Sequence, residues 1–412
     1  MNGAERSIWE RLHRFGSAVR TPEHAVWILV ASSTLTVMAG AVLGPVVNQI
    51  QAALGVSQSL AGLIITTHGL FIVVMSPIAG VLIDRFGPRR PLIFGLGLYG
   101  ITGGAGLVIE TVPLLLLSRA GLGIAVAFVY TSVTVLIYNL YEGERKNRVM
   151  GFRGSANSMG AAIWPLLGGL LGTLSWHGPF GIYLLALPLG ALAVVLVPEP
   201  ATKRLERSGG VRATVRSLVG IIRDTPLLIP VYGLYFLTNV LLYSIVVYYP
   251  GLLATIGLTS SISISLYLSA MGVSGGVSAF FYDRIKRRFT HQQLAVVAFA
   301  LWSVGFGLAT VVSSSLTAAA PVMLFGLGQG LVFPTVLLWI EELVPPDRQG
   351  QFSSYVAMLG YLGQFLSPVV FGPIASRFGP SGVFGGAFVL VVVGLLTAAI
   401  GVTGNDWSTT PP

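Results

Sequence analysis

The 412 residues are 54% hydrophobic and only 9% charged, with 52 glycines and no cysteine. A water-soluble domain of this composition lacks the polar side chains to cover its surface, and disulfides, thiolate metal sites and cysteine nucleophiles are excluded. The formal net charge of +9 would suit a nucleic-acid partner, but in a membrane chain basic residues gather in loops, so we expect no nucleic acid.

Residues 1–24 precede the first long apolar run. Apolar residues from Ile8 to Val19 recur on one helical face, with arginines opposite, which predicts a cytoplasmic amphipathic helix lying in the membrane interface. A solvated tail is the alternative. The spread of arginines through this segment is unlike a cleavable signal peptide.

Twelve apolar runs follow, each long enough to cross a hydrocarbon core of roughly 30 Å as a helix. Charges and Pro/Gly clusters mark their ends. The predicted spans of the first half are 25–49, 59–82, 91–109, 113–139, 149–174 and 178–197. Those of the second half are 227–253, 262–282, 292–312, 320–340, 351–375 and 382–403. The predicted fold class is therefore an all-α integral membrane protein with twelve transmembrane helices.

The two halves repeat each other at an offset of about 200 residues. The matching features are Asp84-Arg85 with Asp283-Arg284, Gly55 with Gly257, and Gly160-x4-Pro165 with Gly363-x4-Pro368. We therefore expect an N-terminal six-helix bundle (25–197), a basic cytoplasmic linker (198–226), a C-terminal six-helix bundle (227–403) and a short cytoplasmic tail (404–412), with the bundles related by a pseudo-twofold axis.

Basic residues fall almost entirely into alternate connections. One side receives the arginines of the N-terminal segment, those near residues 85–90, 145–153 and 284–288, the linker cluster and Arg348, whereas the other side receives only Arg377. The positive-inside rule then predicts that both termini lie in the cytoplasm. We expect the membrane to be a bacterial inner membrane.

The connection between the second and third predicted spans carries the strongest local motif. It consists of Gly80, Asp84, Arg85, Gly87, Arg89 and Arg90, with Leu82 between. This run resembles motif A of the major facilitator superfamily, G-x-L-x-D-R-x-G-R-K, except that Pro88 replaces its first basic residue. An aspartate at a helix end binds the positive N-terminus of another helix. The resemblance implies that Asp84 acts as a conformational latch against the eleventh span, which starts near Gly350.

The fourth span carries Arg119, the only basic residue well inside a predicted span. Leu115, Arg119, Gly123, Ala125 and Ala127 resemble motif B of the superfamily, with Leu122 in place of its glutamine. The resemblance implies a role in proton coupling, and a structural hydrogen bond to carbonyls is the alternative. His68, inside the second span, is a second candidate for proton coupling because its pKa range suits one, or else a packed core residue.

The fifth span resembles motif C, which is found in drug:proton antiporters. The matching residues are Gly151, Gly160, Pro165, Gly168 and Gly169. Trp164 replaces a glycine of that pattern, which weakens the assignment to antiporters. Close packing of small residues without a specific role is the alternative.

Every acidic residue lies in a loop or at a span end, so a cationic substrate is disfavoured against neutral or anionic compounds. Aromatic rings with amides suit a pocket for bulky, partly apolar ligands, and helix packing is the alternative. The candidates for lining that pocket are Trp164, Tyr232, Tyr235, Phe236, Asn239, Tyr243, Gln329 and Gln364.

The resemblance extends over the whole chain in topology and implies a secondary transporter, not an enzyme. We expect a functional monomer in membrane lipid that exports small amphipathic molecules by alternating access. The proton gradient supplies the energy, with no cofactor and no metal, and no ATP-binding motif is present. A proton-coupled symporter for an organic anion or sugar-like solute is the first alternative. An intramembrane enzyme or a receptor-like scaffold is the second.

Overall fold

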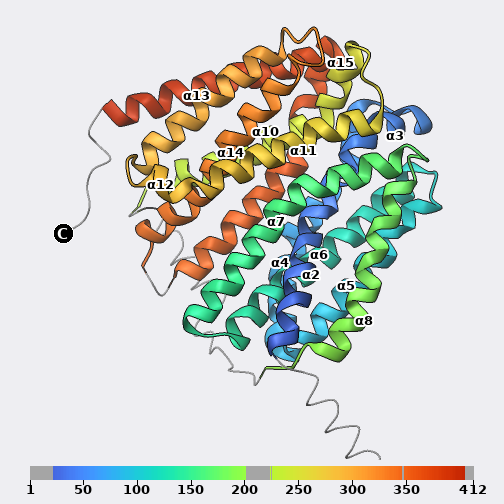
Figure 1. Cartoon of the computed structure of the whole chain (residues 1–412), viewed down its shortest axis with the longest axis vertical. Helices are drawn as coiled ribbons and strands as arrows, with labels where there is room; N and C mark the ends of the chain where they lie inside the picture. The colour runs from blue at the N-terminus through green and yellow to red at the C-terminus, as the bar shows by residue number, and fades with distance from the viewer. Residues whose placement is uncertain (1–21, 201–222, 224, 346–347, 404–412) are drawn as a thin grey trace, which may run out of the picture. The chain divides into compact units, whose positions relative to one another are not determined.

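The computed structural model describes residues 22–200, 223, 225–345 and 348–403, and no β-strand occurs in these parts (Figure 1). The helices before residue 200 are α2 (Pro22–Ala41), α3 (Val47–Leu54), α4 (Gln58–Phe86), α5 (Arg89–Gly104), α6 (Val112–Leu140), α7 (Gly143–Gly172) and α8 (Ala186–Leu196), with 3-10 turns η1 (Gly44–Val46), η2 (Ala105–Leu107) and η3 (Gly178–Leu185). The later helices are α10 (Leu228–Thr255), α11 (Ser261–Phe280), α12 (Tyr282–Lys286), α13 (His291–Ala309), α14 (Ala319–Leu343) and α15 (Gln349–Thr403).

Nine helical stretches among the described residues are long and apolar enough to cross a membrane. One of them, Tyr355–Ile400, is 46 residues long and contains a turn at Gly379, where φ is +68°. It therefore counts as two spans. The helices α5, which has 16 residues, and α7, whose first turns are charged, are two further spans. Together these stretches make up the twelve predicted spans.

Local chemistry explains where the helices depart from the predicted spans. The first span is interrupted after Ala41, because Pro45 lacks the N–H that a continuous helix needs, and a 3-10 turn connects α2 to α3. The sixth span begins with the eight residues of η3 instead of an α-helix. The eighth ends at Phe280, and α12 follows as a separate short helix. Gly55 and Gly257, predicted as equivalent, both have positive φ.

By their packing the helices form two compact units. Within the described residues, unit 1 contains 22–39, 71–160 and 177–200, and unit 2 contains 40–70, 161–176 and the chain from 223 onward. Parts of the first half of the sequence thus belong to unit 2. This division does not test the duplicated six-helix bundles, which stay a prediction. The predicted N-terminal helix, most of the linker and the tail lie outside the described residues.

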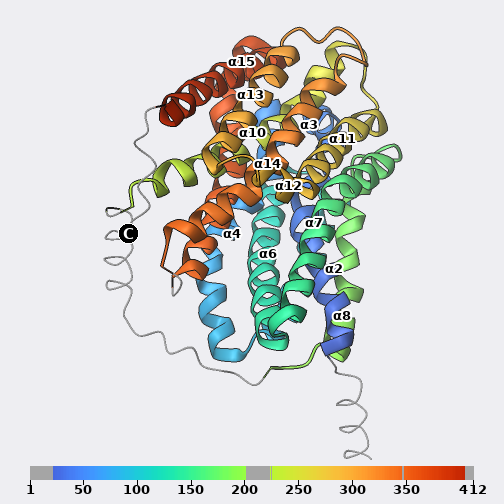
Figure 2. The ribbon, with the colours of Figure 1, turned by 60° about the vertical axis from the view of Figure 1, so that its left-hand side comes forward.

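Within unit 2, α10 packs along α15, and α14 packs against both α11 and α13 (Figure 2). Aromatic rings fill the contact between α13 and α14, where Trp302 stacks on Phe325 at 5.5 Å and donates its indole N–H to the Phe325 carbonyl at 3.0 Å. In unit 1, α5 packs on α6, α8 and η3. These contacts hold the polar side chains described next.

Candidate functional site

Arg119 lies within α6 of unit 1, about 10 Å along the helix axis from Val112 at 1.5 Å per residue. Its side chain is completely buried. The guanidinium carbon lies 5.0 Å from the ring centre of Phe180 and 4.9 Å from that of Tyr183, both in η3. One terminal nitrogen, Nη2, donates to the Gly103 carbonyl at 2.8 Å.

These contacts keep the buried Arg119 cation in place without a carboxylate. A desolvated cation over an aromatic face gains about 2 kcal/mol, and a charge-assisted hydrogen bond adds a similar amount. The other terminal nitrogen, Nη1, is buried and has no hydrogen-bond acceptor among the described residues. Arg119 thus forms the structural hydrogen bond to a carbonyl that is the alternative to proton coupling. A role of Arg119 in proton coupling stays a prediction.

Arg153 is a second buried cation of unit 1, which sequence reasoning assigned to the cytoplasmic basic cluster. Its side chain is only 7% exposed. Nη1 donates to Thr134 Oγ1 at 2.9 Å, and the guanidinium lies 5.0 Å from the ring centre of Tyr130. Because α7 begins at Gly143, earlier than predicted, Arg153 lies nearly three turns inside the helix. Arg153 is thus a second arginine that is buried within a described helix.

The predicted latch motif forms the turn between α4 and α5 in unit 1. Gly87 has φ of +78°, a backbone conformation that favours glycine, and so it allows α4 to end at Phe86 and α5 to begin at Arg89. Arg89 donates to the Val194 carbonyl at 2.5 Å. The side chains of Asp84, Arg85 and Arg90 are exposed, and Gly80 has open space beside it. The role of Asp84 as a latch stays a prediction.

Glu199 completes this turn, and sequence reasoning missed it. Its carboxyl group occupies the space where a side chain at Gly87 would lie. Partial burial raises the pKa of Glu199, and a backbone hydrogen bond from Arg89 and the charges of Arg89 and Arg90 offset part of that rise. The signal in the sequence was an acid between two prolines, Pro198 and Pro200, directly after the sixth span.

His68, the other candidate for proton coupling, lies in unit 2 and is fully buried. Its Nδ1 is 2.7 Å from the carbonyl oxygen of Ile65 in the same helix. The His68 ring and the Tyr243 side chain both lie beside Gly40, where the absence of a side chain makes room for them. The two predicted proton-coupling residues thus belong to different units. Among the described residues, no group of three histidine, aspartate or glutamate side chains is arranged to hold a metal ion.

The motif C glycines differ in their surroundings. Gly168 and Gly169 lie in the part of α7 that belongs to unit 2, where Gly168 abuts the backbone at Val42 and Gly169 abuts Ser261. Gly151 has open space beside it, and Gly160 and Pro165 are buried. Trp164 is half-buried. Of the motif C glycines, Gly168 and Gly169 therefore allow close contact with neighbouring segments, whereas Gly151 does not take part in such a contact.

The predicted pocket-lining residues all belong to unit 2, and the structure brings most of them to the contact of α10 with α14 and α15. Asn239 accepts a hydrogen bond from Gln364 at 3.1 Å. The ring of Tyr235 lies 5.1 Å from that of Phe333. Tyr232 donates to the Phe352 carbonyl at 2.8 Å. Tyr243 is buried, and Phe236 and Gln329 are half-buried. Substrate contact by this cluster stays a prediction.

Comparison with known families decides the identity of the chain. A family model described as the Major Facilitator Superfamily matches residues 29–368. The chain belongs to the major facilitator superfamily. It is therefore a multi-pass membrane protein and a secondary transporter of a small-molecule substrate, and it is not an enzyme.

Curated members of the superfamily resemble this chain at low identity over most of its length. Multidrug resistance protein 1 of Bacillus subtilis (strain 168) is 25% identical over 336 residues, covering 80% of this chain and 84% of that protein. The class C tetracycline resistance protein of Escherichia coli is 25% identical, covering 84% and 88%. The bacillibactin exporter of Bacillus subtilis (strain 168) is 26% identical, covering 85% and 90%.

Solved structures of other major facilitator proteins share the fold. A D-xylose–proton symporter matches with a TM-score of 0.76 at 16% identity, covering 94% of this chain and 98% of that one. The nucleoside transporter NupG matches with a TM-score of 0.77 at 13% identity, covering 91% and 98%. These likenesses establish the major facilitator fold and confirm the predicted fold class.

Proposed function

We propose that this chain is a proton-coupled exporter of small amphipathic compounds. The names of its relatives support this direction of transport, because they include multidrug and tetracycline resistance proteins and a bacillibactin exporter. Motif C, which is typical of antiporters, supports it as well. The site of action is the bacterial inner membrane, with both termini in the cytoplasm, and the monomer is the functional unit.

The main support for transport by alternating access is the packing inside unit 2. Segments 40–70 and 161–176 come from the first half of the sequence, yet they pack on helices of the second half. Asn48 donates to the Pro250 carbonyl at 2.8 Å, and Gln58 donates to the Val247 carbonyl at 3.3 Å. By the predicted topology these contacts lie toward the external side, so they form a closed external gate that must separate when substrate is released.

The described charges favour a neutral or anionic substrate. No aspartate or glutamate among the described residues is fully buried, whereas Arg119 and Arg153 are buried. Buried cations in membrane helices mark substrate or ion pathways. The paired amides of Asn239 and Gln364, with the neighbouring aromatic rings, offer a partly polar surface to an amphipathic molecule.

Proton coupling in this proposal uses Arg119 and His68. An arginine keeps its charge, so Arg119 acts by its electrostatic effect on a neighbouring group, while His68 takes up and releases the proton. The Asp84 turn acts as the latch that favours one conformation. Protons and substrate are the only ligands that the cycle requires.

Transport by purified protein in proteoliposomes tests the proposal. With an imposed proton gradient, we expect neutral and anionic dyes to move against the direction of proton flow, and cationic dyes of similar size to move more slowly. Collapse of the gradient by a protonophore is expected to stop net transport. Dye movement that is unaffected by the gradient would contradict proton coupling.

A proton-coupled symporter is the second candidate, and the two buried arginines favour it, because they suit an organic anion taken up with protons. The same vesicles separate the two functions. In a symporter, the anion accumulates on the side toward which protons flow, whereas in an antiporter it accumulates on the opposite side.

A further inference from the structure

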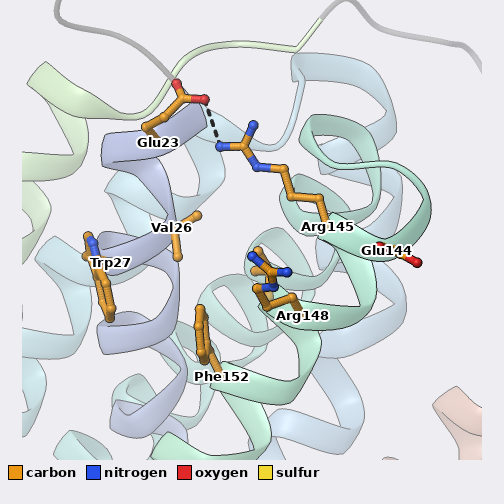
Figure 3. A pocket seen from close by; sticks show the side chains of 8 residues that line it. Glu23, Val26, Trp27, Glu144, Arg145, Arg148 and Phe152 are labelled. Atoms are coloured by element: carbon orange, nitrogen blue, oxygen red, sulfur yellow. Dashed lines mark hydrogen bonds and ion pairs between the residues drawn. The ribbon is translucent and has the colours of Figure 1, made fainter.

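A groove between the start of α2 and the start of α7, both in unit 1, has no part in the proposed transport cycle. It encloses about 620 Å³. The residues that line it are Glu23, Val26, Trp27, Glu144, Arg145, Arg148, Val149 and Phe152 (Figure 3). We propose that this groove binds an anionic phospholipid, with the phosphate at Arg148 and an acyl chain along Trp27 and Phe152.

The lower part of the groove is apolar. Val26 and Val149, which both line the groove, are buried. Trp27 and Phe152 are stacked with ring centres 6.0 Å apart and planes 18° apart, although Trp27 is 66% exposed. A large exposed tryptophan at the end of a membrane helix is typical of the interface between lipid headgroups and acyl chains. These walls therefore suit hydrocarbon rather than a soluble ligand.

The upper part of the groove holds two arginines and two glutamates. Arg145 forms an ion pair with Glu23 at 2.7 Å, which neutralises that carboxylate. The Glu144 side chain points away from the groove, whereas the Arg148 guanidinium lies between the two helices (Figure 3). Arg148 forms no ion pair with any residue in the described parts of the chain. One cation next to the apolar walls thus lacks a counter-charge, and a lipid phosphate supplies one.

The two walls are held together from above. The Tyr141 hydroxyl donates to the Pro22 carbonyl, and the Arg145 guanidinium lies 5.5 Å from the Tyr141 ring centre. Burial raises the pKa of Tyr141 to about 12, so the hydroxyl keeps its proton at neutral pH. The groove is therefore a formed site and not a gap between loose helix ends.

The predicted topology places this groove in the cytoplasmic leaflet, where anionic lipids are enriched. A basic side chain in contact with the lipid phosphate strengthens binding of an anionic lipid by about fivefold, the equivalent of ~1 kcal/mol. We expect phosphatidylglycerol to bind more tightly than phosphatidylcholine with the same acyl chains. This difference in affinity comes from the headgroup charge, since the apolar walls of the groove would contact the acyl chains of both lipids in the same way.

Native mass spectrometry of the delipidated full-length protein, titrated with each lipid, tests the proposal. Arg148→Gln is expected to weaken phosphatidylglycerol binding about fivefold and to leave phosphatidylcholine binding unchanged. Arg288→Gln, which removes an exposed arginine outside the groove, is the matched control and is expected to change neither. Equal phosphatidylglycerol binding by the two variants would overturn the site.

Quenching of tryptophan fluorescence by phosphatidylglycerol with brominated acyl chains locates the lipid. The quenching is expected to decrease in Trp27→Phe, which keeps an aromatic wall, and in Arg148→Gln. Unchanged quenching in Trp27→Phe would overturn the acyl-chain position. Competition by glycerol phosphate as strong as that by the lipid would overturn the lipid as occupant and assign the groove to a soluble anion.

Discussion

Ser261 donates its hydroxyl to the carbonyl oxygen of Gly169 at 2.9 Å. This bond joins α7 to the first turn of α11 inside unit 2, at the end of the helices that the topology predicts to be external. A side chain at Gly169 would lie 2.6 Å from the Ser261 carbonyl oxygen, which is closer than carbon and oxygen approach in stable packing. Gly169 therefore permits the close packing of α7 on α11.

Gly169→Ala is expected to destabilise the closed gate, because overpacking costs about 1–3 kcal/mol and outweighs the gain in helix propensity of up to ~1 kcal/mol. Gly151→Ala, in the same helix but with open space beside it, should be neutral or slightly stabilising. Thermal unfolding of both variants in detergent checks the difference. Equal shifts in melting temperature would contradict the packing argument.

Arg119→Met is expected to abolish proton-driven transport, because the substitution removes the charge but keeps a side chain that fits between Phe180 and Tyr183. Exchange of substrate across the membrane without a gradient should persist. Arg119→Lys retains the charge without the planar stacking, and we expect partial activity. Proteoliposome assays with and without a gradient separate these effects, and full gradient-driven transport by Arg119→Met would remove Arg119 from the mechanism.

Arg153→Gln should weaken transport of anionic substrates by about tenfold or more while leaving neutral ones nearly unchanged, since hydrogen bonds to a charged group contribute about 1.5–3 kcal/mol. Arg153→Lys is the matched control, because it retains the positive charge beside Tyr130. The apparent KM for paired anionic and neutral dyes is the measurement. A similar loss for both dyes would mean that Arg153 has only a structural role.

The raised pKa of Glu199 predicts that the stability of the protein depends on pH. Because its pKa is raised in the folded state, the unfolded chain releases this proton first as the pH rises above about 4.5. The contribution of Glu199 to stability is therefore present at low pH and is lost as the pH rises through the raised value. Melting temperatures measured across this range should fall more steeply for the wild type than for Glu199→Gln. Parallel curves would argue against this effect.

Much of the fold could be predicted from the sequence. Apolar runs, charges, prolines and glycines predict the helices and several of their ends, since these features act over a few neighbouring residues. The connection between the second and third predicted spans, which contains Gly87, was placed in the same way. The helix starts were harder to predict: α7 begins within a charged segment, because charged residues are good helix formers outside the hydrocarbon core. The burial of Arg153 inside α7 was not predicted for that reason.

The sequence by itself determined the membrane class, the helical architecture and the family motifs, because hydrophobic length and backbone preference are local properties. Only the tertiary structure decided which groups meet. It placed Arg119 between Phe180 and Tyr183, brought Glu199 to Gly87, and paired Asn239 with Gln364. Each of these contacts joins segments far apart in the chain, and such contacts depend on how helices cross and pack, which no single segment encodes.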